Sequence, residues 1–291
     1  MVHYNPKAWF GLIFKFHKAE TFRKLFWVMI SLAAFSSIVV YVEGRIWGTS
    51  LATSMAMHSL LGFVISLLLV FRTNTAYDRW WEGRKQWGAL VNVSRNMALK
   101  INAFVPESRD GRKHRLQQMT GIYATVLKDH LRNWSPEKLK EYLPEFMDHS
   151  REVKHIPNFL ANTIQKELLQ AYKEHSLSEA AYLAMLNDLN AFTDICGACE
   201  RIKKTPIPYT YNIFLKKFIF IYIITLPFAL IGDFGYWGVA VTIITFYTFA
   251  SLEMIAEEIE DPFGLDPNDL PTDDLAETIY NNVREILKPQ E

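Results

Sequence analysis

The sequence predicts an all-α membrane protein with four membrane-spanning helices and a large cytosolic helical region. Three observations carry this prediction. Charged residues avoid four hydrophobic windows, basic residues are distributed unevenly among the connecting segments, and the long polar middle segment repeats its apolar residues at helical spacing. Glycine and proline are too sparse in that segment, and alternation of β-branched residues is too weak, for a β-sheet.

The four hydrophobic windows are residues 25–42, 51–71, 218–231 and 236–252. A helix rises about 1.5 Å per residue, so about 20 residues cross the hydrocarbon core of a bilayer. The second window reaches that length, and the third reaches it if its helix begins near Ile213. The alternative is a set of buried core helices in a soluble protein, but such helices usually keep a polar face. These windows carry no charged face, which favours membrane spans.

Basic residues predict the orientation of the spans. The loop between the first two windows holds Arg45 as its one basic residue, and the loop between the last two holds no Lys or Arg. The remaining Lys and Arg residues precede the first window, separate the second from the third, or follow the fourth. By the positive-inside rule, we expect both termini and the middle segment in the cytosol.

These spans and loops divide the chain into five expected parts. In chain order they are a cytosolic amphipathic N-terminal segment (1–24), transmembrane helices 1 and 2 (25–71), a cytosolic helical region (72–212), transmembrane helices 3 and 4 (213–252), and an acidic cytosolic C-terminal segment (253–291).

Composition and motifs exclude several classes of protein. The chain has 31 basic and 31 acidic residues, and this neutrality argues against a nucleic-acid-binding protein. It contains no Walker A loop, no G-x-G-x-x-G, no H-E-x-x-H and no nucleophile elbow, so we expect no enzyme. Cys196 and Cys199 form a C-x-x-C, but a zinc site would need a second ligand pair and a redox site a thioredoxin-like unit. We interpret them as two buried thiols on a helix.

The second window carries a stripe of small and polar residues. Ser54, His58, Gly62 and Ser66 follow one another at four-residue steps, so they share one helical face. An ionisable side chain inside a span should face protein or water rather than lipid. The stripe therefore either packs between helices or lines a water-filled path. The sequence leaves both interpretations open.

The neighbouring stripe of the same window is mostly apolar. It consists of Ser59, Phe63, Leu67 and Phe71, again at four-residue steps. Periodicity alone favours a face in contact with lipid or with the protein core. In a channel, rings of such side chains would instead form a hydrophobic constriction that closes by losing its water.

An acidic cluster follows the fourth window. Its carboxylates are Glu253, Glu257, Glu258, Glu260, Asp261, Asp266, Asp269, Asp273 and Asp274. Oxygen-rich clusters suit hard cations such as calcium, although the spacing matches no EF-hand loop. A solvated acidic face, or a surface that pairs with Arg79, Arg84 and Lys85, is the alternative.

Three segments resemble the bestrophin family, and the third is similar to its bacterial branch. They are FRTNTAYDRWWEGRKQWGALVNVSRNMA at 71–98, AEEIEDPFGLDPNDLP at 256–271 and CERIKKTPIPYTY at 199–211. With four spans in matching places, the resemblance covers nearly the whole chain. It implies a homopentamer around a central pore, in which the second span lines a narrow neck.

The resemblance assigns roles to individual residues. The neck positions are Phe63, Leu67 and Phe71, and Val70 stands where the family has a glycine. The polar residues Ser54, His58 and Ser66 then flank the pore or pack between helices.

Two further sites are implied by the resemblance. The cytosolic aperture falls on Ala180, where relatives carry a larger aliphatic side chain. The calcium clasp of animal relatives maps onto Glu258, Asp261, Asp266 and Asp269, where Pro267 and Asn268 interrupt the acidic run. We expect no required cofactor, with calcium as the one candidate, and doubt that calcium controls opening.

Together these inferences describe a passive channel for monovalent ions. The family implies anion or chloride conduction, and its bacterial branch also allows monovalent-cation selectivity. The expected partners are further copies of the chain, the lipid bilayer and the permeating ions, and the expected location is the bacterial inner membrane. The alternative function is a non-conducting scaffold or a regulator of another membrane protein.

Overall fold

The computed structural model describes residues 20–43, 55–107, 110–133 and 153–287. The expected N-terminal segment up to residue 19 and the predicted pore-flanking Ser54 lie outside these ranges. The chain divides into two compact units. We call residues up to 79 together with 206–260 the membrane unit, and residues 80–205 together with 261–291 the polar unit.

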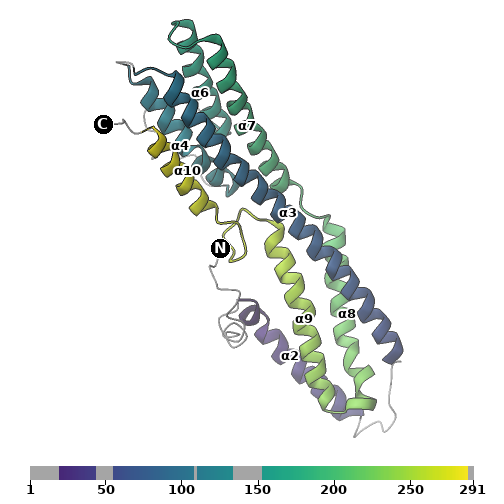
Figure 1. The fold of residues 1–291 in the computed structure, drawn as a ribbon. Helices are drawn as coiled ribbons and strands as arrows, with labels where there is room; N and C mark the ends of the chain where they lie inside the picture. The colour runs from purple at the N-terminus through teal and green to yellow at the C-terminus, as the bar shows by residue number, and fades with distance from the viewer. Residues whose placement is uncertain (1–19, 44–54, 108–109, 134–152, 288–291) are drawn as a thin grey trace. The chain divides into compact units, whose positions relative to one another are not determined.

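The membrane unit contains the four predicted spans. They are α2 (Glu20–Val42), the first part of α3 (Met55–Phe104), α8 (Tyr209–Phe234) and α9 (Trp237–Glu260) (Figure 1). Each of these four helices is long and apolar enough to cross a membrane. The four predicted apolar helices are thereby confirmed.

The span helices extend beyond the hydrophobic windows. Helix α8 begins at Tyr209 and continues through Pro227, which has no N–H to donate to the helix. Gly235 ends it in a left-handed conformation, with φ of 51°, and turns the chain into α9. A side chain at Gly238 would approach the Leu230 Cβ atom to 3.1 Å, so the two helices pack closely at this turn.

The core of the membrane unit lies where α3, α8 and α9 meet. Ile65 and Leu69 of α3 are fully buried against Leu215 and Ile219 of α8, and Phe249 of α9 completes the cluster. Helix α2 packs on both α8 and α9. This packing fixes which side of α3 faces inward.

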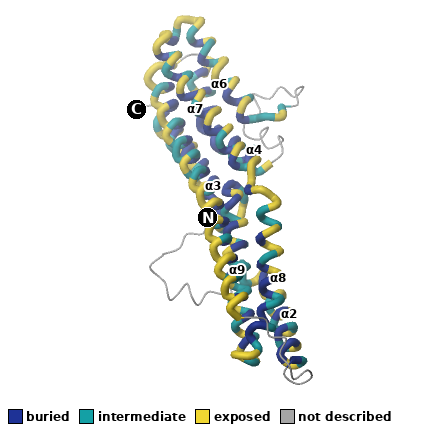
Figure 2. The backbone as a smooth tube through the Cα atoms, turned by 90° about the vertical axis from the view of Figure 1, so that its right-hand side faces the viewer, coloured by how far each residue is buried: buried dark blue, intermediate teal, exposed yellow. Residues whose placement is uncertain are grey.

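The polar unit is a bundle around one hydrophobic core. It comprises the second part of α3, α4 (Arg112–Leu131), α6 (Ile156–Lys173), α7 (Glu179–Lys204) and α10 (Thr272–Ile286). Trp87, Tyr123 and Phe192 are among its fully buried side chains, and the helices bury one side and expose the other (Figure 2). The aromatic rings of Tyr123 and Phe192 lie 4.6 Å apart between centroids.

Helix α10 is tied to α4 by charge as well as by packing. Asp273 in its first turn accepts hydrogen bonds from Arg132 at 2.7 Å and from Lys128 at 2.8 Å. The bond from Arg132, and the charge of Lys128, hold the pKa of Asp273 at about 2 although partial burial opposes this. The carboxylate therefore stays ionised at the helix N-terminus, where a negative charge is favourable.

Helix α3 is a single element of 50 residues that contributes to both units. The sequence predicts that the transmembrane part ends at residue 71, and α3 runs through that position to Phe104. No proline interrupts it, and the glycines at 83 and 88 are tolerated within a helix. Gly83 allows close packing, since a Cβ there would lie 3.1 Å from the Phe263 ring. Where the membrane ends along this helix stays a prediction.

Candidate ion pathway and the contacts that support it

The expected neck residues form an exposed apolar stripe on α3. Phe63, Leu67 and Phe71 are 66%, 45% and 57% exposed in the single chain. Four-residue steps advance about 400° around a helix, so the three side chains share one side over roughly 12 Å. The opposite side of α3 carries the buried Ile65 and Leu69. The stripe is therefore free to contact another molecule, whether pore water, lipid or a second copy of the chain.

The stripe of small and polar residues has a different environment. His58 is buried, its Nε2 atom lies 3.2 Å from the Thr225 hydroxyl, and its ring packs on Tyr222. Gly62 lies against the same tyrosine, because a Cβ there would come within 2.8 Å of the phenol oxygen. The two residues thus contact α8 within one chain. This geometry favours the interpretation of helix packing at His58 and Gly62.

Exposed hydroxyls on α3 bond to their own helix. Ser59, Ser66 and Thr75 donate to the carbonyl oxygens of Met55, Gly62 and Phe71, respectively. Such bonds to the residue four positions earlier satisfy a hydroxyl proton without any partner from outside. Ser66 is exposed beside the apolar stripe, whereas His58 is not, so the four-residue pattern does not keep one environment along the helix.

A buried ion pair anchors α3 just beyond the stripe. Arg72 follows Phe71 directly, is 1% exposed, and donates to Glu260 Oε2 at 2.6 Å. The other oxygen of Glu260 accepts the backbone N–H of Ile207 at 2.6 Å, and Arg79 donates to its carbonyl oxygen. Glu260 is the last residue of α9. The pair therefore fixes the rotation of α3 relative to α9 next to Phe71.

The candidate aperture residue lies in the first turn of α7. Ala180 is exposed, and Ser178 caps the helix by accepting the backbone N–H of Ala181 at 3.3 Å. The turn before it follows α6 and places His175 in a left-handed conformation, with φ of 57°. Histidine tolerates that region better than most residues with a side chain.

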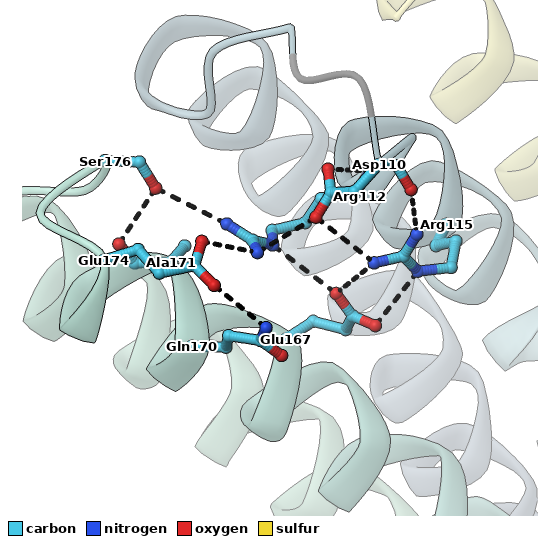
Figure 3. A network of polar contacts seen from close by, with 8 residues as sticks. All are labelled: Asp110, Arg112, Arg115, Glu167, Gln170, Ala171, Glu174 and Ser176. Atoms are coloured by element: carbon cyan, nitrogen blue, oxygen red, sulfur yellow. Dashed lines mark hydrogen bonds and ion pairs between the residues drawn. The ribbon is translucent and has the colours of Figure 1, made fainter.

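A buried arginine holds this turn in place. Arg112 of α4 donates to Glu174 at 2.8 Å and to the Ser176 hydroxyl at 3.5 Å, and Asp110 lies 3.0 Å from the same guanidinium (Figure 3). Arg115 binds Glu167 of α6 through two hydrogen bonds. Hydrogen bonds from Gln170 and Arg112 lower the pKa of Glu174. The position of Ala180 thus depends on contacts between α4 and the end of α6.

The acidic segment after α9 folds around one of its own carboxylates. Asp269 is buried, and its Oδ2 atom accepts the backbone N–H of Asp266 at 2.7 Å. A Cβ at Gly264 would lie 2.7 Å from the same oxygen, so a larger residue there would have to displace this carboxylate. Trp80 of α3 donates to the Asn268 carbonyl oxygen at 3.0 Å. Asp269 therefore organises the loop from inside.

The carboxylates expected to bind calcium do not gather as a cluster of side-chain ligands. Glu258 lies 3.8 Å from Lys24 in an ion pair. Calcium takes six to eight oxygen ligands, and in the described ranges three or more potential metal-ligating side chains meet at one place only, which is elsewhere in the polar unit. The calcium site stays a prediction.

The C-x-x-C motif lies in the C-terminal half of α7. Cys196 and Cys199 are both buried and form no disulfide. Burial raises the pKa of each thiol to about 12, so neither forms the reactive thiolate at neutral pH. The interpretation as two buried thiols is confirmed.

Known proteins resemble the chain over nearly its whole length. Residues 1–285 match the family model described as Bacterial/Fungal Bestrophin protein. A voltage-dependent anion channel-forming protein of Synechocystis is 33% identical, over 98% of this chain and 93% of that protein. A protein of the same description from Nostoc is 39% identical, over 77% and 74% of the two chains.

Solved structures agree with these sequence relatives. A bacterial bestrophin homologue from Klebsiella pneumoniae superimposes with a TM-score of 0.83 at 28% identity, covering 92% of this chain and all of that one. The resemblance inferred from the motifs at 71–98, 199–211 and 256–271 therefore extends to the fold. The chain belongs to the bacterial and fungal branch of the bestrophin family.

Proposed function

We propose that this bestrophin-type ion channel conducts monovalent ions passively through a pore enclosed by several copies of α3. The protein is a membrane-embedded ion channel and not an enzyme, as its family and its relatives indicate. The narrowest part of the proposed pore is the neck, formed by copies of Phe63, Leu67 and Phe71. The observation that carries this assignment is the exposure of all three side chains on the side of α3 opposite the core of the membrane unit.

The proposed channel is a homopentamer in the bacterial inner membrane. One chain presents a single stripe and cannot enclose a path, so the stripe needs further copies. Five copies would stack three apolar rings along the axis. Both termini lie in the cytosol in this proposal, because Arg45 is the one basic residue in the loops on the other side.

The neck acts as a gate in this proposal. An ion that crosses three apolar rings loses water and gains no polar ligand in exchange, which is unfavourable. A narrow ring therefore excludes both water and ions, and a wide, wet ring conducts. The stripe carries no charge, so the neck itself discriminates weakly between anions and cations. The relatives are named as anion channel-forming proteins, and the sign of the current is measured directly by the reversal potential.

No cofactor is required for conduction in this proposal. Calcium, if added, would meet Asp261, Asp266 and Asp269 in a loop that Asp269 already holds together. We therefore expect channels recorded in a calcium chelator to remain open to the same extent after micromolar calcium is added. Currents that rise from near zero on calcium addition would contradict this.

The neck assignment is tested by current recording from reconstituted protein. Replacing Phe63, Leu67 and Phe71 together by alanine should widen the constriction and raise the current at fixed protein density. The matched control is alanine at Phe220, Ile221 and Ile244, which are equally exposed and apolar but lie on α8 and α9. The control should leave the single-channel conductance unchanged.

Two results would reject the assignment. Conductance that is unchanged by the triple neck substitution, combined with altered selectivity in Ser66→Ala, would place the pore wall on the polar side of α3. The complete absence of current under an ion gradient would favour a non-conducting scaffold or a regulator of another membrane protein.

A further inference from the structure

Three residues far apart in the sequence converge in the polar unit. His130 lies at the end of α4, His155 is the N-cap residue of α6, and Glu200 lies near the end of α7. The Nε2 atoms of His130 and His155 lie 2.5 Å and 3.0 Å from the same oxygen, Oε1 of Glu200. The three ligand atoms all lie within 4.8 Å of one another. We call these residues the His–His–Glu cluster.

The cluster has the exposure of a binding site rather than of a surface ion pair. The side chains of His130, His155 and Glu200 are 21%, 33% and 19% exposed, so they are sheltered but reachable from solvent. The two imidazole rings lie 4.5 Å apart between centroids. Lys204 also lies 3.8 Å from Glu200, and its side chain is largely exposed. None of these residues takes part in the proposed ion pathway.

The chemistry of the donors selects the ligand. Two imidazole nitrogens and one carboxylate oxygen are a common ligand set for zinc, with a water molecule at the fourth position. Hard cations such as calcium prefer oxygen atoms only, which makes this set unsuited to calcium. A bond of about 2.0–2.1 Å to each donor requires the Glu200 oxygen to move slightly away from the two Nε2 atoms, which lie 2.5 Å and 3.0 Å from it. We propose that the His–His–Glu cluster is a binding site for a divalent transition-metal ion of the zinc class.

The proposed ion replaces hydrogen bonds that hold the cluster together without it. The Nδ1 atom of His155 accepts the backbone N–H of Asn158 at 3.2 Å, so a neutral ring carries its proton on Nε2, facing Glu200. Metal binding through Nε2 transfers that proton to Nδ1, and the N-cap bond to Asn158 is lost. Binding should therefore fasten the ends of α4, α6 and α7 together while exposing the amide of Asn158.

The test is metal binding to the full-length protein in detergent after removal of metals with a chelator. Zinc is titrated by calorimetry, and cobalt(II) is used as a spectroscopic probe, because its visible absorption is strong in four-coordinate sites. The variants are His130→Ala, His155→Asn and Glu200→Gln. Asparagine at 155 keeps an N-cap acceptor for α6, and glutamine at 200 keeps a hydrogen-bond acceptor, so the helices retain their ends.

Two control variants distinguish metal binding at the His–His–Glu cluster from metal binding by other side chains. His114→Asn removes an exposed histidine on the same helix, α4. Replacing both Cys196 and Cys199 by serine removes the neighbouring thiols. We expect one zinc per chain in the native protein and in both controls. Each cluster variant should lose affinity by roughly tenfold or more, since even second-shell changes at metal sites cost that much.

The measurements of metal binding and hydrogen exchange can support or contradict the proposed site. Intense cobalt absorption that disappears in Glu200→Gln, and faster hydrogen exchange of the Asn158 amide on zinc addition, would support the site. Binding that is unchanged in all three cluster variants, or lost in the double serine control, would overturn it. So would the absence of zinc binding to the native protein at micromolar concentrations.

Discussion

At the scale of single residues, the ion pair between Arg72 and Glu260 connects stability to the proposed pore. Both residues are buried, and Glu260 uses both carboxylate oxygens, one for Arg72 and one for the backbone of Ile207. A buried charge that loses its partner keeps its full desolvation penalty. The pair should therefore contribute more to the stability of the protein than the exposed ion pairs of the chain do.

Replacing Glu260 by glutamine should destabilise the protein by about 3–5 kcal/mol, because the charge of Arg72 is left uncompensated in a buried position. The measurement is thermal unfolding in detergent, with the current of reconstituted channels as a second readout. Glu257→Gln is the matched control, since Glu257 pairs with Lys216 in an exposed position and should contribute about 0–1 kcal/mol. Equal losses of stability in both variants would mean that burial does not increase the contribution of the ion pair between Arg72 and Glu260.

The sequence indicated part of this arrangement. Pairing between the acidic cluster and Arg79 is one of the expected alternatives, and Arg79 donates to the backbone carbonyl oxygen of Glu260. Arg72 was missed because it follows directly on the hydrophobic stripe and is 188 positions from its partner. No local pattern specifies a contact across that distance.

At the scale of elements, the turn between α6 and α7 determines where Ala180 lies. The buried guanidinium of Arg112 contacts Glu174 and Ser176, and Ser178 caps α7. The first turn of α7 is therefore held rigidly although Ala180 is exposed. A side chain added there would project from a fixed position.

The variant Ala180→Ile should narrow the cytosolic exit of the proposed pore and reduce single-channel conductance. A methyl group cannot close a ring of five tightly, whereas a branched aliphatic side chain reaches further toward the axis. Ala180→Ser is the control, since it changes polarity with little change in size. Conductance that is unchanged or larger in the isoleucine variant would show that the aperture lies elsewhere.

Helical periodicity predicted the element types well, because hydrophobic faces recur at helical spacing. Composition predicts a change from a membrane to a cytosolic segment after residue 71, and the helix runs through that position. The backbone continues as one helix to Phe104 because no proline or capping residue ends it. Amino-acid composition indicates whether a segment lies in lipid or in water. It does not by itself indicate where a hydrogen-bonded helix ends.

At the scale of the whole molecule, the family and the four spans were predictable from the sequence, and the assembly remains to be measured. We expect native mass spectrometry in detergent to give five chains per particle. Tags at either terminus should be accessible only from the cytosolic side of the membrane. A monomeric particle, or a tag that is accessible from the periplasm, would contradict the proposed channel.

The His–His–Glu cluster shows the limit of sequence reasoning at this scale. His130, His155 and Glu200 stand on three helices and share no spacing that a motif could capture. In the sequence, Cys196 and Cys199 have the spacing of zinc ligands but no second ligand pair. The packing of α4, α6 and α7 brings two histidines to the residue next to Cys199, which only the folded chain reveals.

The hydroxyl bonds along α3 have a consequence for the sign of the permeating charge. Ser59, Ser66 and Thr75 direct their protons at their own backbone, so each turns only oxygen lone pairs outward. A passing cation meets these lone pairs ready to coordinate it. A passing anion finds no O–H group free to donate a hydrogen bond to it. A hydroxyl becomes such a donor only when it rotates and breaks its hydrogen bond to the helix. Wherever these three hydroxyls face the path, the resting wall is therefore better prepared to replace the hydration shell of a cation than that of an anion.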